Sequence, residues 1–84
     1  MSGVVKVLAF AGARELVGAA ELELEVDPLQ CTVADLMDEI CARHPGLAGY
    51  RSIIRVAVNG VYASDGQPVV AGDEVALIPP VAGG

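Results

Sequence analysis

The last six residues of this chain, PPVAGG, are the stretch whose residue types could take part in chemistry. Gly83 and Gly84 have no Cβ, so they could pass through a narrow channel and let another protein approach the terminal carboxyl group closely. Pro79 and Pro80 fix φ and favour an extended path, and Val81 adds a small apolar contact. Because a terminal carboxylate is ionised, it is a poor electrophile until another enzyme activates it, for example as an acyl-adenylate made with ATP. The tail is predicted to be a substrate handle, and the alternative is an end without function.

The rest of the chain offers no convincing catalytic group. The single histidine, His44, lies in an RHPG segment expected at the end of a helix, where it favours interaction with the helix dipole. We find no serine in a nucleophile elbow and no glycine-rich phosphate-binding loop. Cys31 and Cys41 have neither zinc-site nor C-x-x-C spacing, and Cys41 is expected to be a buried structural thiol. We therefore expect a protein that is not catalytic alone and that holds no metal.

Composition and charge restrict the partners of the chain. It has 84 residues, a formal net charge of −6, 54% hydrophobic residues and a mean hydropathy of +0.55. The negative charge argues against binding to nucleic acid and suits a basic protein partner. A chain of this size has little interior, so part of its apolar residues should form a surface patch that binds a partner. The alternative is a core filled by the abundant alanine and valine.

The N-terminal stretch VVKVLAFAGA resembles the core of a signal peptide, but Lys6 interrupts it and no basic segment precedes it. No segment approaches the roughly 20 apolar residues that cross a bilayer. A cytoplasmic protein without membrane partners is expected.

Several strands must position the tail. The strict alternation in AELELEV, residues 20–26, predicts a strand with leucine and valine on one face and three glutamates on the other. Asn59-Gly60 predicts a tight hairpin turn, because both residues tolerate positive φ. The other strands are expected at residues 4–10 and 53–58, from residue 61 onward and at residues 74–78, and residues 12–18 should break the first pattern.

One helix is predicted after the first two strands. Thr32 can cap it, and Asp35 completes a pair of the capping-box kind. Pro45 should end it near His44. One apolar stripe at helical spacing follows from the sequence, and its members are Val33, Leu36, Met37, Ile40 and Cys41.

These elements predict one α+β domain with β-β-α-β-β order, in which a hairpin, one main helix and a second hairpin are followed by a closing strand. A closing strand that pairs in parallel beside the first would make the sheet mixed. Residues 1–78 form the domain in this prediction. Residues 79–84 form a protruding, flexible C-terminal tail that could extend about 20 Å.

The chain resembles the MoaD family, the ubiquitin-like sulfur carriers that form the small subunit of molybdopterin synthase. The resemblance runs nearly end to end, and its most specific segments are VKVLAFAGARELVG, RHPGL, AVNG and GDEVALIPPVAGG. It implies a β-grasp fold. It also implies that an E1-like (MoeB-like) enzyme adenylates Gly84, and that a sulfur donor protein then supports conversion of the glycyl adenylate into a thiocarboxylate (1-thioglycine). The tail would enter the large (MoaE-like) synthase subunit and give its sulfur to a pterin precursor of molybdopterin.

The resemblance assigns two sets of site residues. The chemistry falls on the terminal pair, Gly83 and Gly84, whereas partner binding falls on the stalk, a hydrophobic surface and one charged position. The partner-binding residues are Phe10, Arg14, Tyr62, Ile78, Pro79, Pro80 and Val81. No tightly bound cofactor is implied. Because only 4% of the residues are aromatic, the docking surface here should rely on aliphatic side chains.

Two other functions stay open at this point. The same fold could serve as a ThiS-like carrier for thiazole synthesis, or as a dual-use carrier that also conjugates to proteins through Gly84. A β-grasp interaction module without terminal chemistry is the alternative from another functional class. Substitution of the last residue separates this module from the carriers.

Overall fold

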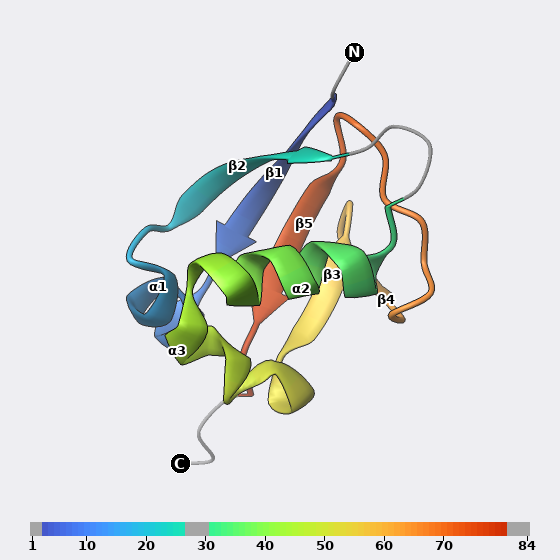
Figure 1. Cartoon of the computed structure of the whole chain (residues 1–84). Coiled ribbons are helices and arrows are strands. Elements are labelled where there is room, and N and C mark those ends of the chain that lie inside the picture. Colours follow the sequence, from blue (N-terminus) through green and yellow to red (C-terminus); the bar gives the residue numbers. More distant parts are fainter. Residues whose placement is uncertain (1–2, 27–30, 81–84) are drawn as a thin grey trace.

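The computed structural model describes residues 3–26 and 31–80, which form a five-stranded mixed sheet with helices on one face (Figure 1). The elements in chain order are β1 (Gly3–Ala9), α1 (Ala11–Val17), β2 (Glu21–Val26), α2 (Val33–Arg43), α3 (Pro45–Ala48), η1, a single 3₁₀ turn (Arg51–Ile53), β3 (Arg55–Val58), β4 (Val61–Ala63) and β5 (Glu74–Ile78).

The last strand occupies the centre of the sheet, whose strand order is β2-β1-β5-β3-β4. Strand β5 pairs in parallel with β1, so that Leu8 lies opposite Ala76, and antiparallel with β3, so that Ala57 also lies opposite Ala76. Strands β1 and β2 form the first hairpin, and β3 and β4 form the second. The predicted mixed sheet and the parallel closing strand are confirmed.

Helix α2 crosses one face of the sheet, which we call the inner face (Figure 1). Strand alternation directs every second side chain toward the helix, and the predicted helical stripe meets them. Val33, Leu36, Met37 and Ile40 of the stripe are buried, whereas Cys41 is half-buried at the edge of the core, which corrects the expectation of a buried thiol. The strands contribute to the core Val5, Val7, Ala9, Leu24, Val56, Val58, Val75 and Leu77.

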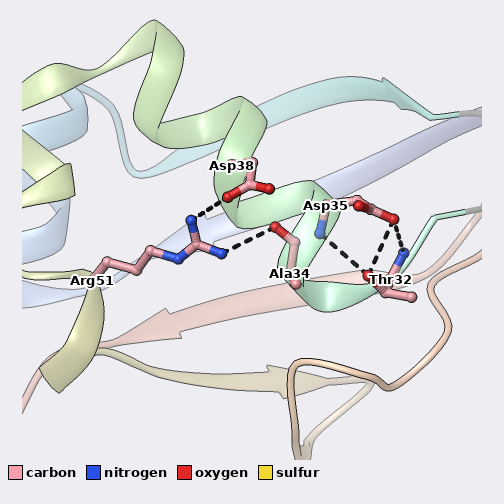
Figure 2. A network of polar contacts seen from close by, with 5 residues as sticks. All are labelled: Thr32, Ala34, Asp35, Asp38 and Arg51. Atoms are coloured by element: carbon pink, nitrogen blue, oxygen red, sulfur yellow. Dashed lines mark hydrogen bonds and ion pairs between the residues drawn. The ribbon is translucent and has the colours of Figure 1, made fainter.

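Helix α2 begins at the capping box that the sequence predicts (Figure 2). The Thr32 hydroxyl accepts a hydrogen bond from the Asp35 N–H at 3.2 Å, and the Asp35 carboxylate accepts one from the Thr32 N–H at 3.1 Å. These two bonds satisfy N–H groups that the helix itself leaves unpaired. The helix ends at Arg43, as predicted, and Pro45 occupies the first position of the short helix α3.

The turn between β3 and β4 also follows its local sequence. Asn59 and Gly60 have φ values of 51° and 84°, the left-handed region that a tight hairpin turn requires. The Asn59 side chain accepts a hydrogen bond from the Glu74 N–H at 2.9 Å and donates one to the Asp73 carboxylate at 3.0 Å. The hairpin is thereby tied to the start of β5.

The structure corrects two boundaries. Residues 12–18, expected to break the pattern, belong mostly to helix α1, because Ala13 and Val17 both face the core and Gly18 ends the helix with φ 83°. The third strand begins at Arg55 rather than at residue 53, because η1 precedes it. The fold has one main helix and a closing strand, as predicted, and it adds two short helices, α1 and α3, to the predicted order. None of the helices in the described ranges is long and apolar enough to cross a membrane.

Candidate partner-binding site at the foot of the C-terminal tail

The described chain leaves the sheet from its centre. Strand β5 ends at Ile78, with β1 on one side and β3 on the other, and Pro79 and Pro80 follow. The Phe10 N–H donates a hydrogen bond to the Leu77 carbonyl at 3.3 Å, which extends the contact of β1 with β5 to the exit point. The residues before the tail are therefore held by hydrogen bonds on both sides.

The face of the sheet away from α2, the outer face, carries an apolar groove of about 340 Å³ beside this exit. We call it the sheet-face groove. It forms because alternate residues of β1, β3, β4 and β5 point away from the helix, and the pairing aligns them in one row across the four strands. Its lining residues are Leu8, Phe10, Ala57, Gly60, Tyr62, Glu74, Ala76 and Ile78.

The aromatic residues of the sheet-face groove are accessible. Tyr62 is 66% exposed and Phe10 is 45% exposed, although both are large hydrophobic side chains. The Arg55 guanidinium carbon lies 6.0 Å from the centroid of the Tyr62 ring, within the range of a cation–π interaction. Exposed aromatic side chains next to a charged rim are typical of the centre of a protein–protein interface.

A second apolar groove, of about 560 Å³, lies between α1, the segment 50–54 and the two prolines. We call it the foot groove. Tyr50 and Ile53 contribute to it, and each is about half exposed. Its other lining residues are Ala11, Gly12, Ala13, Glu15, Leu16, Ile54, Pro79 and Pro80.

Arg51 lies next to Tyr50 in the chain and bonds to helix α2 (Figure 2). Its guanidinium donates to the Ala34 carbonyl at 3.2 Å and forms an ion pair with Asp38. The hydrogen bond with Asp38 is the main cause that raises the pKa of Arg51 above its ordinary value. The neighbours Tyr50 and Ile53 are thus fixed relative to the helix.

The structure brings together part of the predicted site. Phe10, Tyr62 and Ile78, far apart in sequence, line the one sheet-face groove, and their role in binding stays a prediction. Pro79 and Pro80 line the foot groove instead. Arg14 is exposed on α1 and is not one of the residues that line either groove. The remaining predicted residues, Val81, Gly83 and Gly84, lie outside the described part of the chain.

Several lining residues escaped the sequence analysis. Leu8 lies two positions before Phe10, which directly follows β1, and Ala76 lies two positions before Ile78 on β5, so the strand period carried the signal for both. Tyr50 and Ile53 had no comparable signal, because the foot groove depends on how distant segments pack against one another.

Comparison with known proteins decides the family. Residues 7–84 match the ThiS family. The chain belongs to that family. It is 41% identical over 80 residues to the molybdopterin synthase sulfur carrier subunit of Arabidopsis thaliana, which covers 95% of this chain and 82% of the relative. It is 40% identical to the human protein of the same name, over 95% of this chain and 93% of the relative.

An archaeal relative has both a related sequence and a solved structure. The small archaeal modifier protein 1 of Haloferax volcanii is 36% identical over 89% of this chain and 94% of the relative. A crystal structure of that protein superposes with a TM-score of 0.83 and 33% identity, covering 94% of this chain and 99% of the other. The ubiquitin-like β-grasp fold that the family resemblance implies is confirmed.

Proposed function

We propose that this chain is the sulfur carrier subunit of a molybdopterin synthase, and that it acts through the carboxyl group of Gly84. The observation that supports the proposal most is the identity of 40–41%, over 95% of the chain, to two proteins with that name. The match to the ThiS family extends through residue 84, so it includes the Gly-Gly pair.

The proposed chemistry takes place in three steps on the tail. An E1-like adenylating enzyme lets the Gly84 carboxylate attack ATP, which releases pyrophosphate and forms a glycyl adenylate. A sulfur nucleophile supplied through a donor protein then displaces AMP, so that a C–S bond replaces the C–O bond to phosphate and a thiocarboxylate results. Within the large synthase subunit the sulfur passes to a pterin precursor, and water restores the carboxylate. No tightly bound cofactor takes part, and the pathway is cytoplasmic in this proposal.

The folded domain contributes docking and delivery in this scheme. The sheet-face groove offers an apolar contact beside the exit of the tail. Pro79 and Pro80 restrict the backbone at that exit, which lowers the entropy lost when the tail enters a partner. The net charge of −6 suits a partner whose pocket binds an anionic pterin.

The proposal is tested by co-expression with the adenylating enzyme and the sulfur donor, followed by intact-mass analysis. The wild-type chain should gain the mass difference between one sulfur and one oxygen atom. The Gly84→Val variant is the control, because a branched Cβ crowds the carboxyl group and should prevent activation. A chain that binds the large subunit and never acquires sulfur would support the β-grasp interaction module instead.

A second candidate function is protein modification through the same carboxyl group. The 36% identity to the small archaeal modifier protein 1 favours it. In that case the amine of a lysine on another protein would attack the glycyl adenylate, so that an amide bond forms and AMP is released. Covalent adducts that survive boiling in detergent and disappear with Gly84→Val would identify this activity.

Membership of the ThiS family also leaves a sulfur carrier for thiazole synthesis as an alternative. Complementation of strains that lack either molybdopterin synthesis or thiazole synthesis separates this carrier from the proposed one.

A further inference from the structure

The outer face of the sheet carries a row of carboxylates along one flank of the sheet-face groove. Glu21, Glu23 and Glu25 of the edge strand β2 are all exposed and project from the same face, about 7 Å apart along the strand. Glu21 lies directly opposite Leu8, which lines the groove. The row is therefore one strand away from the apolar surface.

The single lysine of the chain does not neutralise this flank. The ammonium nitrogen of Lys6, on β1, lies 3.4 Å from Glu21 Oε1. Lys6 is also paired with Glu23 of β2 on one side and with Glu74 of β5 on the other. Four carboxylates, those of Glu74 and the three on β2, thus share this part of the outer face with one ammonium group. Half of the net charge of −6 is concentrated here.

The opposite flank of the groove carries positive charge. Arg55 is exposed at the start of β3, opposite Ile78, and lies over the ring of Tyr62. The ion pairs of the described residues do not include Arg55, so its charge is available to a partner. The sheet-face groove therefore lies between a row of carboxylates on β2 and one positive charge, that of Arg55, at the start of β3.

We infer that the sheet-face groove is an oriented docking surface. Its partner protein places apolar side chains in the groove, lysine or arginine opposite β2, and an aspartate or glutamate opposite Arg55. Opposite charges on the two sides of the groove stabilise one orientation of the partner. They disfavour the orientation rotated by about 180°, because like charges of the two proteins would then face each other. A single orientation matters because the tail leaves at one end of the groove and must enter the partner at one place. This inference rests on the proposed function, since it deepens the role of the docking face.

Whether a substitution of Arg55 speeds or slows association with the partner distinguishes this inference from simple attraction between an acidic chain and a basic partner. Arg55→Glu makes the chain more negative, so attraction by net charge alone predicts faster association. An oriented docking surface predicts slower association, because the partner's carboxylate would then face another carboxylate. Glu23→Lys should slow association as well, since it places positive charge opposite the partner's basic side chains.

The experiment measures association rates of these two variants with the purified large synthase subunit of the same organism, at low and at physiological salt. Both variants should associate about 3- to 10-fold more slowly than wild type at low salt, with a smaller difference at higher salt. Asp65→Lys is the control matched to Glu23→Lys in charge. Asp65 is exposed beside the start of α2, on the other side of the sheet, where its carbonyl accepts a hydrogen bond from Ala34. Melting curves verify that each variant is folded.

Three outcomes support or overturn the oriented docking surface. Slower association of both Arg55→Glu and Glu23→Lys, with Asp65→Lys near wild type, supports the oriented surface. Faster association of Arg55→Glu, or equal slowing by Glu23→Lys and Asp65→Lys, shows that net charge alone acts and overturns it. A wild-type chain that does not bind the large subunit overturns the proposed function itself, and the oriented surface with it.

Discussion

The two faces of the sheet are made by the same strands, yet side chains on the inner face are buried and several on the outer face are exposed. On the inner face, Val5, Val7 and Leu77 are fully buried beneath the helices, and the core has no buried polar side chain among the described residues. On the outer face, Tyr62 and Phe10 are largely exposed and have charged side chains on both flanks. A shift of one residue along a strand exchanges one environment for the other.

This difference indicates that stability and recognition can be altered separately at neighbouring positions. Leu77 and Ile78 are adjacent on β5, but the first is fully buried in the core and the second is half-buried in the sheet-face groove. Substitutions on the inner face should therefore act on the free energy of unfolding. Substitutions on the outer face should act on partner binding.

The largest expected effect comes from a change that leaves both faces untouched. One alanine added after Gly84 moves the reactive carboxyl group about 3.5 Å along the partner's channel. Because a misplacement of about 1 Å can cost 10²-fold in a positioned reaction, ATP-dependent adenylate formation should be abolished. The melting temperature should not change, since the addition lies beyond the core.

Measurement of adenylate formation and of the melting curve on the same preparation checks this prediction. An extended chain that is still adenylated and still accepts sulfur, without proteolytic trimming, would refute the idea that partners recognise the tail at its last atom.

Leu77→Ala should have the largest effect on stability. Removal of a fully buried leucine side chain from the central strand should lower the free energy of unfolding by about 2–5 kcal/mol. Ile78→Ala, one position away, should cost distinctly less, because that side chain is only half-buried. Denaturant titrations of the two variants measure the difference. Equal losses would show that the outer face contributes to stability as much as the core does.

Tyr62→Asp should weaken binding to the large synthase subunit and to the adenylating enzyme while the fold is retained. The substitution removes the exposed ring from the sheet-face groove and places a carboxylate beside Arg55. Loss of a central aromatic contact typically costs about 2 kcal/mol or more in binding. Calorimetric titration with each partner gives the affinity. Unchanged affinity for both partners would place the docking surface elsewhere.

The smallest effect is expected at the start of α2, where Thr32 lines neither groove. Thr32→Ala removes the capping hydroxyl of α2 and should lower the free energy of unfolding by about 1 kcal/mol. Partner affinity should stay the same. Thr32→Ser, which keeps the hydroxyl, is the matched control and should restore most of the loss.

Local chemistry decided which parts of the fold could be predicted. Thr32 with Asp35 and Asn59 with Gly60 carry their own hydrogen-bonding and φ requirements, so the helix start and the hairpin turn followed from the sequence. Helix α1 did not, because it has only seven residues, includes Gly12, and depends on Ala13 and Val17 packing against the core.

The candidate site also has a part that could be predicted from the sequence and a part that could not. The family resemblance assigned Phe10, Tyr62 and Ile78 to a docking surface, and the strand pairing brings all three into one groove. The foot groove was not foreseeable, because Arg51 fixes its wall through contacts with Ala34 and Asp38, which are 17 and 13 positions away. Such contacts arise only once the helices are packed on the sheet.

The central position of β5 has a mechanical consequence. A partner that draws in the tail pulls along β5, which is hydrogen-bonded to β1 on one side and to β3 on the other. The load then acts parallel to the strand and is shared by both rows of hydrogen bonds at once, so the strand cannot be peeled away one bond at a time. The fold should therefore resist traction applied through Pro79 and Pro80 at the end of β5, and the domain should stay intact under that load.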